Sequence, residues 1–508
     1  MKKVYIQFFY KIFIMFMLGC VSLIPKGTFA QETPKNRALL IACERFVTAP
    51  ESTPAGLHNL NMMEKILQQD LRGFEIFRQY GIISSEEALL AAVCHAFRDA
   101  RENDISLLYI CTHGEYDVRK ENAEAALLLS DGALEDRVSA AQLETMLDLI
   151  PGTKILIIDA CNSSALIGKG APPGEKTDRK TNHFQSSAYR MLLSSGANEP
   201  SWYWISSQET APPGSSYFTT ALALGAGLMG GFEADANHDG IITLQEMYQY
   251  LWVNQASSTV QMYPQDDSFP FIVYDRSLLQ ENQKGELIGF VFPSTALDPE
   301  NPMLTFQYTA RSNARVVYQI TYQKKGVWDW DQAATIPDES EFDGDGDPLG
   351  DITPGRKEVT LDLSGILPPD WTYAMIHVIT HVDHGSNSEP FIYAARVLSA
   401  KNKRDPKLSV QTAEVWEKAE GSELQIFIGH AVPCGMTVQI EDEQGKLIRR
   451  LAASRQTRPQ VLTPEGSLFY WNGLDDQGAA VPEGKYSIVV SARIDGERYE
   501  ARGEVAVK

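Results

Sequence analysis

The stretches ISLLYICTHG (105–114) and ILIIDACNS (155–163) decide the fold of this chain. Each is a short run of apolar and β-branched residues bounded by turn residues, which is the pattern of a strand buried on both faces of a parallel sheet. In open α/β sheets, ligands and catalytic groups lie just beyond the carboxyl ends of the strands. The sequence therefore places the imidazole of His113 and the thiol of Cys161 at two such strand ends.

A thiol beside an imidazole is the minimal set of groups for thiolate catalysis. The imidazole favours the thiolate and later protonates the leaving amine. A free cysteine by itself is more often a small core residue, and we interpret Cys94 and Cys111 in this way. The order of a strand ending in His-Gly and a later strand ending in Asp-Ala-Cys favours a catalytic role for Cys161.

These strand ends resemble those of the caspase-like cysteine peptidases, which include caspases, metacaspases, clostripain, gingipain and legumain. The bacterial metacaspase-like proteins are the most similar, because their strands end in His-Gly and in Asp-x-Cys. One departure is Asn162-Ser163-Ser164, where metacaspases usually have His-Ser-Gly, so the shape of the loop after Cys161 stays open. The resemblance covers residues 36–275 and is carried by RALLIACERF (37–46), LHNLNMMEKIL (57–67), SSEEALLAAVCHAFRDARENDISLLYICTHG (84–114) and WYWISSQETAPPGSSYFTTALALG (202–225).

The resemblance implies roles for the residues at both strand ends. Cys161 would be the nucleophile and His113 the general acid that protonates the leaving amine. The backbone N–H groups of Gly114 and Cys161 would form the oxyanion hole, and a glycine suits this place because no side chain blocks the approach. Ser207 is implied to contact the substrate.

Asp159 stands two residues before Cys161, so its carboxylate points to the same side of the strand as the thiol. A carboxylate in a specificity pocket selects a basic side chain through a charge-assisted hydrogen bond. The matching Asp of metacaspases lines the pocket for the residue before the cut, and we therefore predict cleavage after Arg or Lys. The alternative is a structural Asp that bonds local N–H groups.

A second motif, DANHDGIITLQE (235–246), matches the twelve-residue calcium loop position by position. It supplies the hard oxygen ligands that Ca²⁺ needs, with Gly240 at the sharp turn. Because there is one such loop, we expect a structural Ca²⁺ rather than a paired sensor; the alternative is a bare acidic turn. The predicted ligands are Asp235, Asn237, Asp239, the carbonyl of Ile241, Thr243 and Glu246.

Residues 168–190 are rich in Gly, Pro and Lys without an apolar period, which predicts an exposed loop directly after the catalytic strand. Caspase-like enzymes are often self-cleaved in this region. A plain insertion is the alternative. The candidate cut sites are Lys169, Lys176, Arg179, Lys180 and Arg190.

The N-terminal sequence predicts export. Two lysines precede an apolar run and Ala30 ends a small-residue cleavage site, so we interpret residues 1–30 as a signal peptide of a bacterial protein that is periplasmic, cell-surface or secreted. A transmembrane anchor is disfavoured because the run from Ile12 to Ile24 is short. The other alternative is lipidation of Cys20, which would be the only route to membrane association.

The overall composition narrows the range of partners. The formal net charge of −21 argues against nucleic acid, which needs clustered Lys and Arg. Five cysteines follow residue 30, and their odd number and scattered positions argue against a disulfide framework.

Beyond residue 275 the pattern changes to period-two alternation. Residues 285–400 are predicted to form a β-sandwich, and residues 408–508 a second all-β domain. The segment YWNGLDDQGAAVPEGKYSIVVSA (470–492) resembles the immunoglobulin-like module of the flagellar hook-capping protein. Such modules are spacers or binding platforms, so partners at the cell surface are expected for these domains.

The predicted fold is thus an α/β caspase-like domain (36–275), with a mostly parallel sheet flanked by helices, followed by two all-β immunoglobulin-like sandwiches. The predicted function is that of an exported cysteine endopeptidase that hydrolyses protein or peptide substrates with a Cys-His dyad. One alternative is a catalytically silent caspase-like binding or scaffold protein, against which the presence of both His113 and Cys161 argues. Another thiol hydrolase or transferase is disfavoured by the order of the two motifs.

Overall fold

The computed structural model describes residues 34–508 apart from sixteen short segments. The segments left out are 50–54, 117–123, 171–182, 206–213, 256–257, 279–286, 312, 314, 325–326, 337–351, 382–389, 401–407, 420, 431–433, 458–465 and 495–496. The predicted signal peptide and Cys20 therefore lie outside the described residues. Within the described ranges, no helix is long and apolar enough to cross a membrane.

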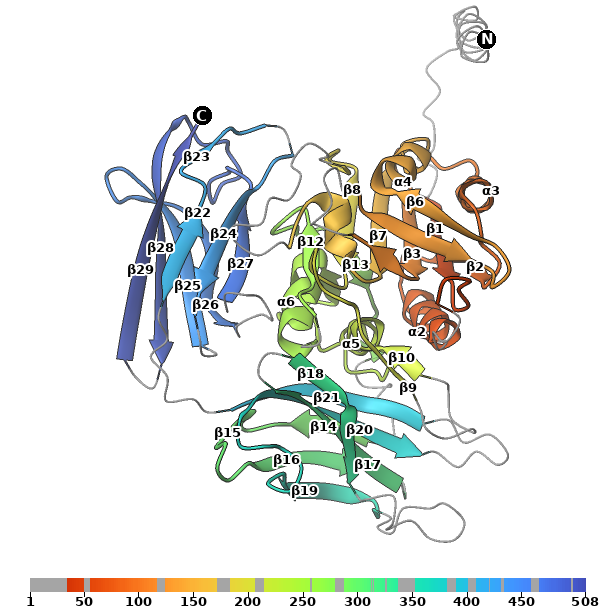
Figure 1. Ribbon diagram of the computed structural model, residues 1–508, viewed down its shortest axis with the longest axis vertical. Coiled ribbons are helices and arrows are strands. Elements are labelled where there is room, and N and C mark those ends of the chain that lie inside the picture. Colours follow the sequence, from red (N-terminus) through yellow and green to blue (C-terminus); the bar gives the residue numbers. More distant parts are fainter. Residues whose placement is uncertain are drawn as a thin grey trace, which may run out of the picture. The chain divides into compact units, whose positions relative to one another are not determined.

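A six-stranded sheet forms the centre of the N-terminal domain (Figure 1). The strand order is β12-β8-β7-β3-β1-β2, and all neighbours are parallel except β12, which runs antiparallel to β8. The two apolar runs of the sequence form β3 and β7, which are neighbours in the middle of the sheet. The strands are β1 (Asn36–Ala42), β2 (Phe74–Tyr80), β3 (Ile105–Cys111), β7 (Thr153–Asp159), β8 (Tyr189–Leu193) and β12 (Gln261–Tyr263).

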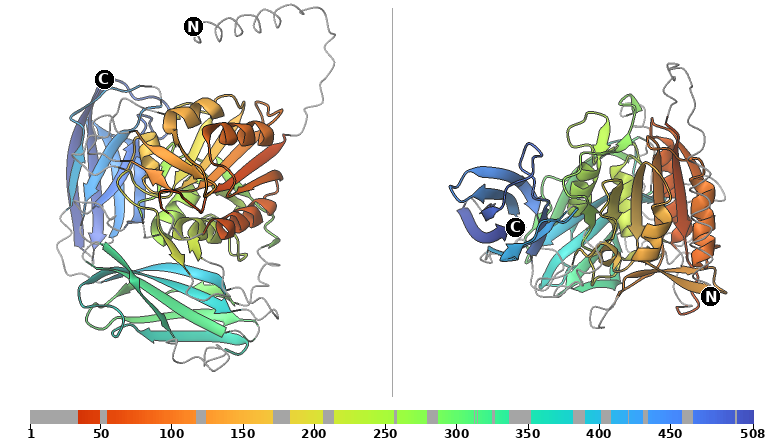
Figure 2. Two further views of the ribbon diagram at one scale, coloured as in Figure 1. Left: turned by 45° about the vertical axis from the view of Figure 1, so that its right-hand side comes forward. Right: turned by 90° about the horizontal axis from the view of Figure 1, so that it is seen from above.

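Helices cover both faces of this sheet, as the left view of Figure 2 shows. Alternate residues of one strand serve opposite faces: Leu107 packs in the cluster with α2, α5 and α6, whereas Leu108 packs in the cluster with α3 and α4. Burial on both sides explains why the strands are continuously apolar. The helices are α2 (Gly56–Gln68), α3 (Glu86–Ala96), α4 (Ala140–Leu147), α5 (Tyr217–Gly225) and α6 (Leu244–Asn254).

Serine side chains fix the starts of three of these helices. Ser85 accepts a hydrogen bond from the Ala88 N–H at the start of α3, and Ser216 accepts from two N–H groups at the start of α5. Ser139 forms a capping box with Gln142 at the start of α4. Each cap satisfies backbone donors that the first helical turn leaves without a partner.

Three small sheets accompany the central one. The first, β4-β5-β6, continues directly from the His-Gly end of β3, and the second pairs β9 with β10. The third pairs β11 with β13 and holds the end of the predicted calcium loop. Their strands are β4 (Gly114–Glu115), β5 (Ala126–Ser130), β6 (Glu135–Ser139), β9 (Tyr203–Ile205), β10 (Gly214–Ser216), β11 (Ile241–Thr243) and β13 (Pro270–Val273).

From residue 287 on, every helix or strand that the structure describes is a strand, as predicted. A three-stranded sheet, β14-β16-β19, and a five-stranded sheet, β15-β21-β20-β17-β18, form the middle domain around a shared apolar core. These strands are β14 (Leu287–Val291), β15 (Ala296–Leu297), β16 (Met303–Ala310), β17 (Arg315–Lys324), β18 (Val327–Ile336), β19 (Gly355–Asp362), β20 (Trp371–His381) and β21 (Pro390–Ala400).

The C-terminal domain repeats this topology strand for strand. Its sheets are β22-β24-β27 and β23-β29-β28-β25-β26, so each strand takes the place of the one eight positions earlier in the strand numbering. In both domains the short second strand pairs in parallel with the last strand. The strands are β22 (Ser409–Thr412), β23 (Val415–Trp416), β24 (Leu424–Gly429), β25 (Cys434–Asp442), β26 (Leu447–Thr457), β27 (Gly466–Trp471), β28 (Gly484–Ile494) and β29 (Glu497–Val507).

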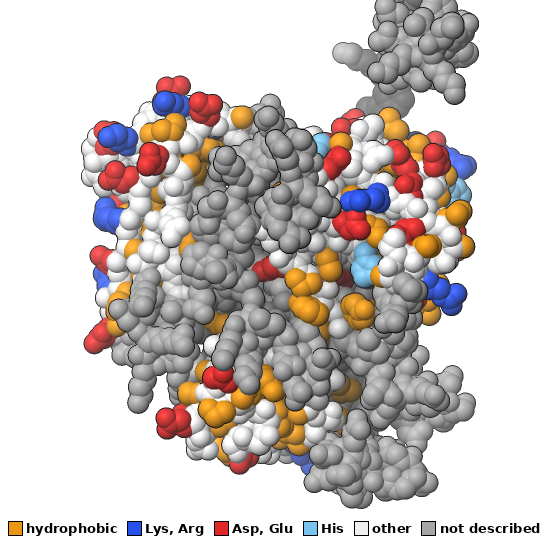
Figure 3. All heavy atoms as spheres, viewed as in Figure 1, with side chains coloured by type: hydrophobic (Ala, Val, Ile, Leu, Met, Phe, Trp, Pro, Cys, Tyr) orange, Lys and Arg blue, Asp and Glu red, His pale blue; other side chains and the backbone are white. Residues whose placement is uncertain are grey.

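The predicted architecture is confirmed: a mostly parallel sheet with helices is followed by β-sheets consistent with immunoglobulin-like sandwiches. On the face shown in Figure 3, acidic and basic side chains are interspersed over the described surface. One prediction about the core is wrong, because Cys94 is exposed. It falls on the outer face of α3, whose buried residues are Leu89, Ala92, Val93 and Ala96.

Candidate active site

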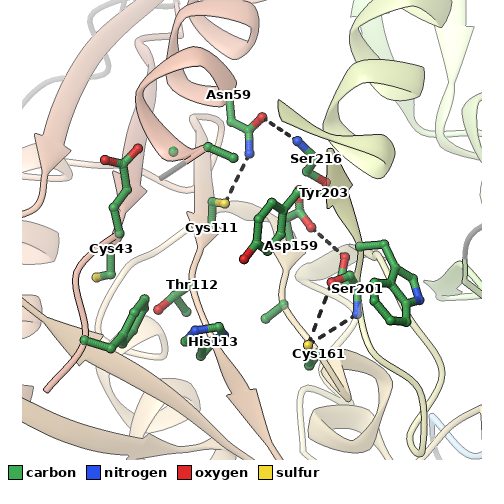
Figure 4. Close-up of a pocket in the computed structure, with 16 residues that line it drawn as sticks. Cys43, Asn59, Cys111, Thr112, His113, Asp159, Cys161, Ser201, Tyr203 and Ser216 are labelled. Atoms are coloured by element: carbon green, nitrogen blue, oxygen red, sulfur yellow. Dashed lines mark hydrogen bonds between the residues drawn. The ribbon is translucent and has the colours of Figure 1, made fainter. Parts of the chain in front are cut away.

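A pocket lies at the carboxyl ends of β1, β3 and β7 (Figure 4). In the parallel pairing of β3 with β7, Cys111 is opposite Asp159. His113 and Cys161 each follow two residues later, so both reach the same level at this edge of the sheet. The residues lining the pocket are Cys43, Glu44, Phe46, Ala55, Gly56, Asn59, Cys111, Thr112, His113, Asp159, Ala160, Cys161, Ser201, Trp202, Tyr203 and Ser216.

The thiol of Cys161 is bound to the main chain of Ser201. The Ser201 N–H donates to the sulfur at 3.4 Å, and the thiol donates to the Ser201 carbonyl oxygen at 3.8 Å. Within the described residues, no hydrogen bond joins this thiol to the imidazole of His113, whose buried Nε2 atom has no partner. The structure thus shows the two groups facing one pocket without a direct contact.

Burial sets the charge state of both groups. Desolvation raises the pKa of the Cys161 thiol; the nearby Asp159 carboxylate adds to this effect, and the Ser201 N–H opposes it. Desolvation also lowers the pKa of His113, against the attraction of Glu135 and Glu115. The neutral thiol and the neutral imidazole are therefore the favoured forms in this state.

The imidazole is positioned by neighbours in the segment that follows β1 and on β5. The Phe46 ring lies 4.2 Å from the His113 ring, centroid to centroid. The His113 carbonyl oxygen accepts from the Leu128 N–H at 2.9 Å, which ties the end of β3 to the small sheet. Glu135 accepts from the N–H of Val47 at 2.8 Å and so holds the segment that carries Phe46.

Gly114 packs directly against the main chain of Cys161. A β-carbon added at Gly114 would lie 1.9 Å from the carbonyl oxygen of Cys161, so no other residue fits without moving the backbone. The predicted oxyanion hole places the N–H groups of these same two residues together. This close approach gives a steric reason for a glycine at position 114.

Asp159 is 3% exposed and lies in a cradle of hydroxyl groups. Ser201 Oγ donates to Oδ1 at 2.9 Å, and Thr219 Oγ1 donates to Oδ2 at 2.6 Å. Burial raises the pKa of this carboxyl, while the hydroxyls of Ser216, Thr219, Ser201 and Ser194 oppose the rise. These two partners are hydroxyl groups from segments that are distant along the chain.

The loop after Cys161 has a defined shape. Asn162 adopts a left-handed conformation with φ of 56°, which Asn tolerates better than most residues. Its side chain donates to the Ala197 carbonyl at 2.8 Å. A short 3₁₀ helix, η1 (Ser163–Ile167), follows, and both of its serine hydroxyls donate to the Ser195 carbonyl.

The pocket contains residues that the sequence did not indicate. Cys111, expected in the core, lines the pocket and accepts from Asn59 Nδ2 at 3.2 Å. Asn59 is fully buried and also accepts from the Ser216 N–H, so it joins α2 to the start of α5. Phe46 and Ser201 lack any sequence signal, because their places in the pocket depend on the tertiary fold. Ser207 lies outside the described residues.

The predicted cut sites have different surroundings. Lys169 is 7% exposed, forms an ion pair with Glu423, and donates to the Met262 carbonyl at 3.0 Å. Arg190 lies on β8 and pairs with Asp267 at 3.0 Å. The expectation that these two residues belong to an exposed loop is therefore wrong, and neither is offered to a protease in this state. Lys176, Arg179 and Lys180 lie outside the described residues.

The predicted calcium loop is ordered by its own carboxylates. Asp235 is fully buried, and its Oδ2 accepts from Tyr274 Oη at 2.7 Å and from the Gly240 N–H at 2.9 Å. Asn237 and Asp239 accept from backbone N–H groups further along the loop. Glu246 instead accepts from the N–H and hydroxyl of Thr243 in a capping box of α6. In the parts of the chain that are described, no cluster of three or more His, Cys, Asp or Glu is arranged to hold a metal.

The fold and the pocket define an α/β domain of the caspase type, and comparison with known families agrees. Residues 35–227 match the model of the caspase domain, and residues 431–496 match the model of the FlgD Ig-like domain. The chain therefore contains a caspase domain and a FlgD-type immunoglobulin-like domain. No curated protein matches this chain.

Solved structures similar to this chain include three of low overall similarity. Protein GSU0716 of Geobacter sulfurreducens is 14% identical over 48% of this chain and 100% of its own, with a TM-score of 0.34. Caspase-1 of Spodoptera frugiperda is 14% identical over 51% of this chain and 97% of its own, with a TM-score of 0.31. FlgD of P. aeruginosa is 21% identical over 18% of this chain and 62% of its own, with a TM-score of 0.14.

The charge state of Cys161 can be tested by alkylation. Because its pKa is raised above the ordinary value of 9.0, its thiolate fraction at pH 7 is small and grows only as the pH passes 9. We expect iodoacetamide to label Cys161 more slowly than the exposed Cys94 at pH 7, as measured by mass spectrometry of the peptides. Faster labelling of Cys161 at pH 7 would show that a thiolate is already formed in the resting protein.

Proposed function

We propose that this protein is an exported cysteine endopeptidase that uses Cys161 and His113. The observation that carries the proposal is the placement of the two groups at one level, on the ends of adjacent strands, facing one pocket within a caspase domain. A caspase domain implies cysteine peptidase chemistry. Export is supported by the N-terminal sequence alone, in which a short apolar run precedes the cleavage site at Ala30.

The reaction follows from the groups in the pocket. The Cys161 thiol gives its proton to the His113 imidazole, the sulfur attacks the carbonyl carbon of the peptide, and the oxygen of the resulting tetrahedral adduct is held by the N–H groups of Gly114 and Cys161. His113 protonates the leaving amine, and the C–N bond breaks to leave a thioester. Water then hydrolyses the thioester, which releases the acid and restores the thiol.

Replacing the nucleophile should separate an enzyme from a scaffold. We expect Cys161→Ala to lower the hydrolysis of fluorogenic peptides by several orders of magnitude, because the sulfur forms the covalent intermediate. Cys94→Ala is the matched control, since that thiol is exposed on α3 and is not among the residues that line the pocket. Equal turnover by Cys161→Ala and the unmodified protein would exclude this nucleophile. A lack of turnover by the unmodified protein would favour the silent scaffold.

We propose that Asp159 selects Arg or Lys before the cut. Its carboxylate is buried beside Cys161 and lines the same pocket, and an unpaired cation there would gain a charge-assisted hydrogen bond. An Asp at the same substrate position would instead meet a buried like charge.

The specificity can be tested with Asp159→Asn, which keeps the size of the side chain. Losing one partner of a buried charge pair costs about 2–5 kcal/mol, so kcat/KM for Arg and Lys substrates should fall roughly 30- to 5,000-fold. Turnover of a substrate with Gln at that position should fall much less and serves as the control. If the unmodified protein prefers Asp or apolar residues, the assignment of Asp159 is wrong.

We also propose that the loop 235–246 binds Ca²⁺ as a structural ion. The side-chain oxygens of Asp235, Asn237 and Asp239 already accept hydrogen bonds from N–H groups within the loop. In a paired sensor a second calcium loop would pair with β11, whereas here β11 pairs with β13. To complete the ligand set, Glu246 must leave its capping box with Thr243 and turn into the loop. Bound Ca²⁺ would supply charge that neutralises these carboxylates.

Calcium should therefore raise the melting temperature of protein stripped with a chelator. A ligand bound only by the folded state adds about 2.7 kcal/mol at a hundredfold excess over its Kd. Calorimetry of Glu246→Gln should show no calcium effect, because the amide removes the charged bidentate ligand yet can still form the capping box. Magnesium should substitute poorly, since it demands stricter octahedral geometry. If calcium does not change the melting temperature of the stripped unmodified protein, the loop 235–246 is only an acidic turn.

The two β domains follow the catalytic domain in the chain, and we propose that they act as spacers or as platforms for partners at the cell surface. The support is their immunoglobulin-like topology and the match of residues 431–496.

A further inference from the structure

Ser201 uses all three of its polar groups on the candidate active site. Its N–H and its carbonyl oxygen both contact the Cys161 sulfur, and its hydroxyl donates to Asp159 Oδ1 at 2.9 Å. Figure 4 shows Ser201 between the two side chains, with dashed lines to each. Ser201 therefore contacts both the proposed nucleophile, Cys161, and the carboxylate of Asp159 that is proposed to recognise the substrate.

The two hydroxyls on Asp159 differ in how firmly they are held. Thr219 is fully buried at the start of α5, and its hydroxyl also bonds the buried Tyr109 hydroxyl at 2.7 Å. Ser201 is only half-buried, forms part of the pocket wall, and precedes the short strand β9. Of the two donors, Ser201 is the one that an entering ligand can replace.

We propose that Ser201 is a gating residue, whose hydroxyl stands in for the substrate's cation until an Arg or Lys side chain displaces it from Asp159. Because a rotation about the Cα–Cβ bond of Ser201 can free the hydroxyl while the Ser201 N–H stays on the sulfur, the exchange concerns Asp159 alone. A basic side chain replaces the hydroxyl on Asp159 as it binds, whereas a neutral or acidic side chain leaves the hydroxyl in place. The inference rests on the proposed role of Asp159 and adds the residue that holds this carboxylate while the pocket is empty.

The gate has a measurable effect on binding. In Ser201→Ala, one oxygen of a buried carboxylate loses its donor while the pocket is empty, and the incoming cation restores the bond. Affinity for a cation should therefore rise by about tenfold, which corresponds to about 1.4 kcal/mol. Ser201→Thr keeps the hydroxyl and is the matched control.

The experiment measures binding of agmatine, which carries the guanidinium group of Arg, to the full chain by isothermal titration calorimetry. We expect Ser201→Ala to bind about tenfold more tightly than the unmodified protein, Ser201→Thr to bind with nearly unchanged affinity, and Asp159→Asn to lose binding. Equal affinity in Ser201→Ala and the unmodified protein, with loss in Asp159→Asn, would overturn the gate and leave the specificity proposal standing. No binding by any of the proteins would overturn both. Agmatine binding does not depend on peptide hydrolysis, so this measurement distinguishes failure of the gate from failure of the proposed peptidase activity.

Discussion

The parallel pairing of β3 with β7 is the constraint on which the rest of the site depends. With Cys111 opposite Asp159, the two strands end at one level, and the residues that follow meet across a single pocket. Both strands are buried on both faces, so a shift of register by one residue would exchange the two sets of side chains between two different helix layers. The absence of a side chain at Gly114 then lets the two strand ends approach to van der Waals contact.

Desolvation shifts the pKa values of the ionisable groups in the pocket. It favours the neutral forms of Cys161 and His113 and raises the pKa of Asp159, and the hydroxyl groups of Ser201 and Thr219, which donate to this carboxylate, oppose that rise. Burying a carboxylate that lacks hydrogen-bond donors would cost more free energy than a single hydrogen bond contributes to stability. In the empty pocket, the Cys161 thiol and the Asp159 carboxylate thus already have hydrogen-bond partners, and under the proposed function a substrate would exchange these partners for its own groups.

The β domains show how topology can be shared without an obvious sequence pattern. Strands β14 to β21 and β22 to β29 have the same order in their sheets, yet only the C-terminal domain carried a motif that resembled a known module. Alternation of buried and exposed residues predicted strands in both domains, because that signal is local. Strand order depends on which strands meet at long range, so the duplication of topology emerged only in the structure.

The sequence by itself determined the parts of this protein that are set by local patterns. The apolar runs predicted β3 and β7, their end residues predicted which side chains would meet at the pocket, and the Leu57–Leu67 stretch predicted the helix that became α2. The tertiary structure alone decided that Ser201 would lie on Cys161 and Asp159, that Phe46 would pack on His113, and that Lys169 would be buried. These contacts join segments about forty or more residues apart along the chain, for which no periodicity or short motif exists. Cys94 is the opposite case, where a local apolar stretch suggested burial and the packing of α3 turned the residue outward. The local sequence determines the secondary structure of each segment, whereas the packing of distant segments against one another determines which side chains are in contact.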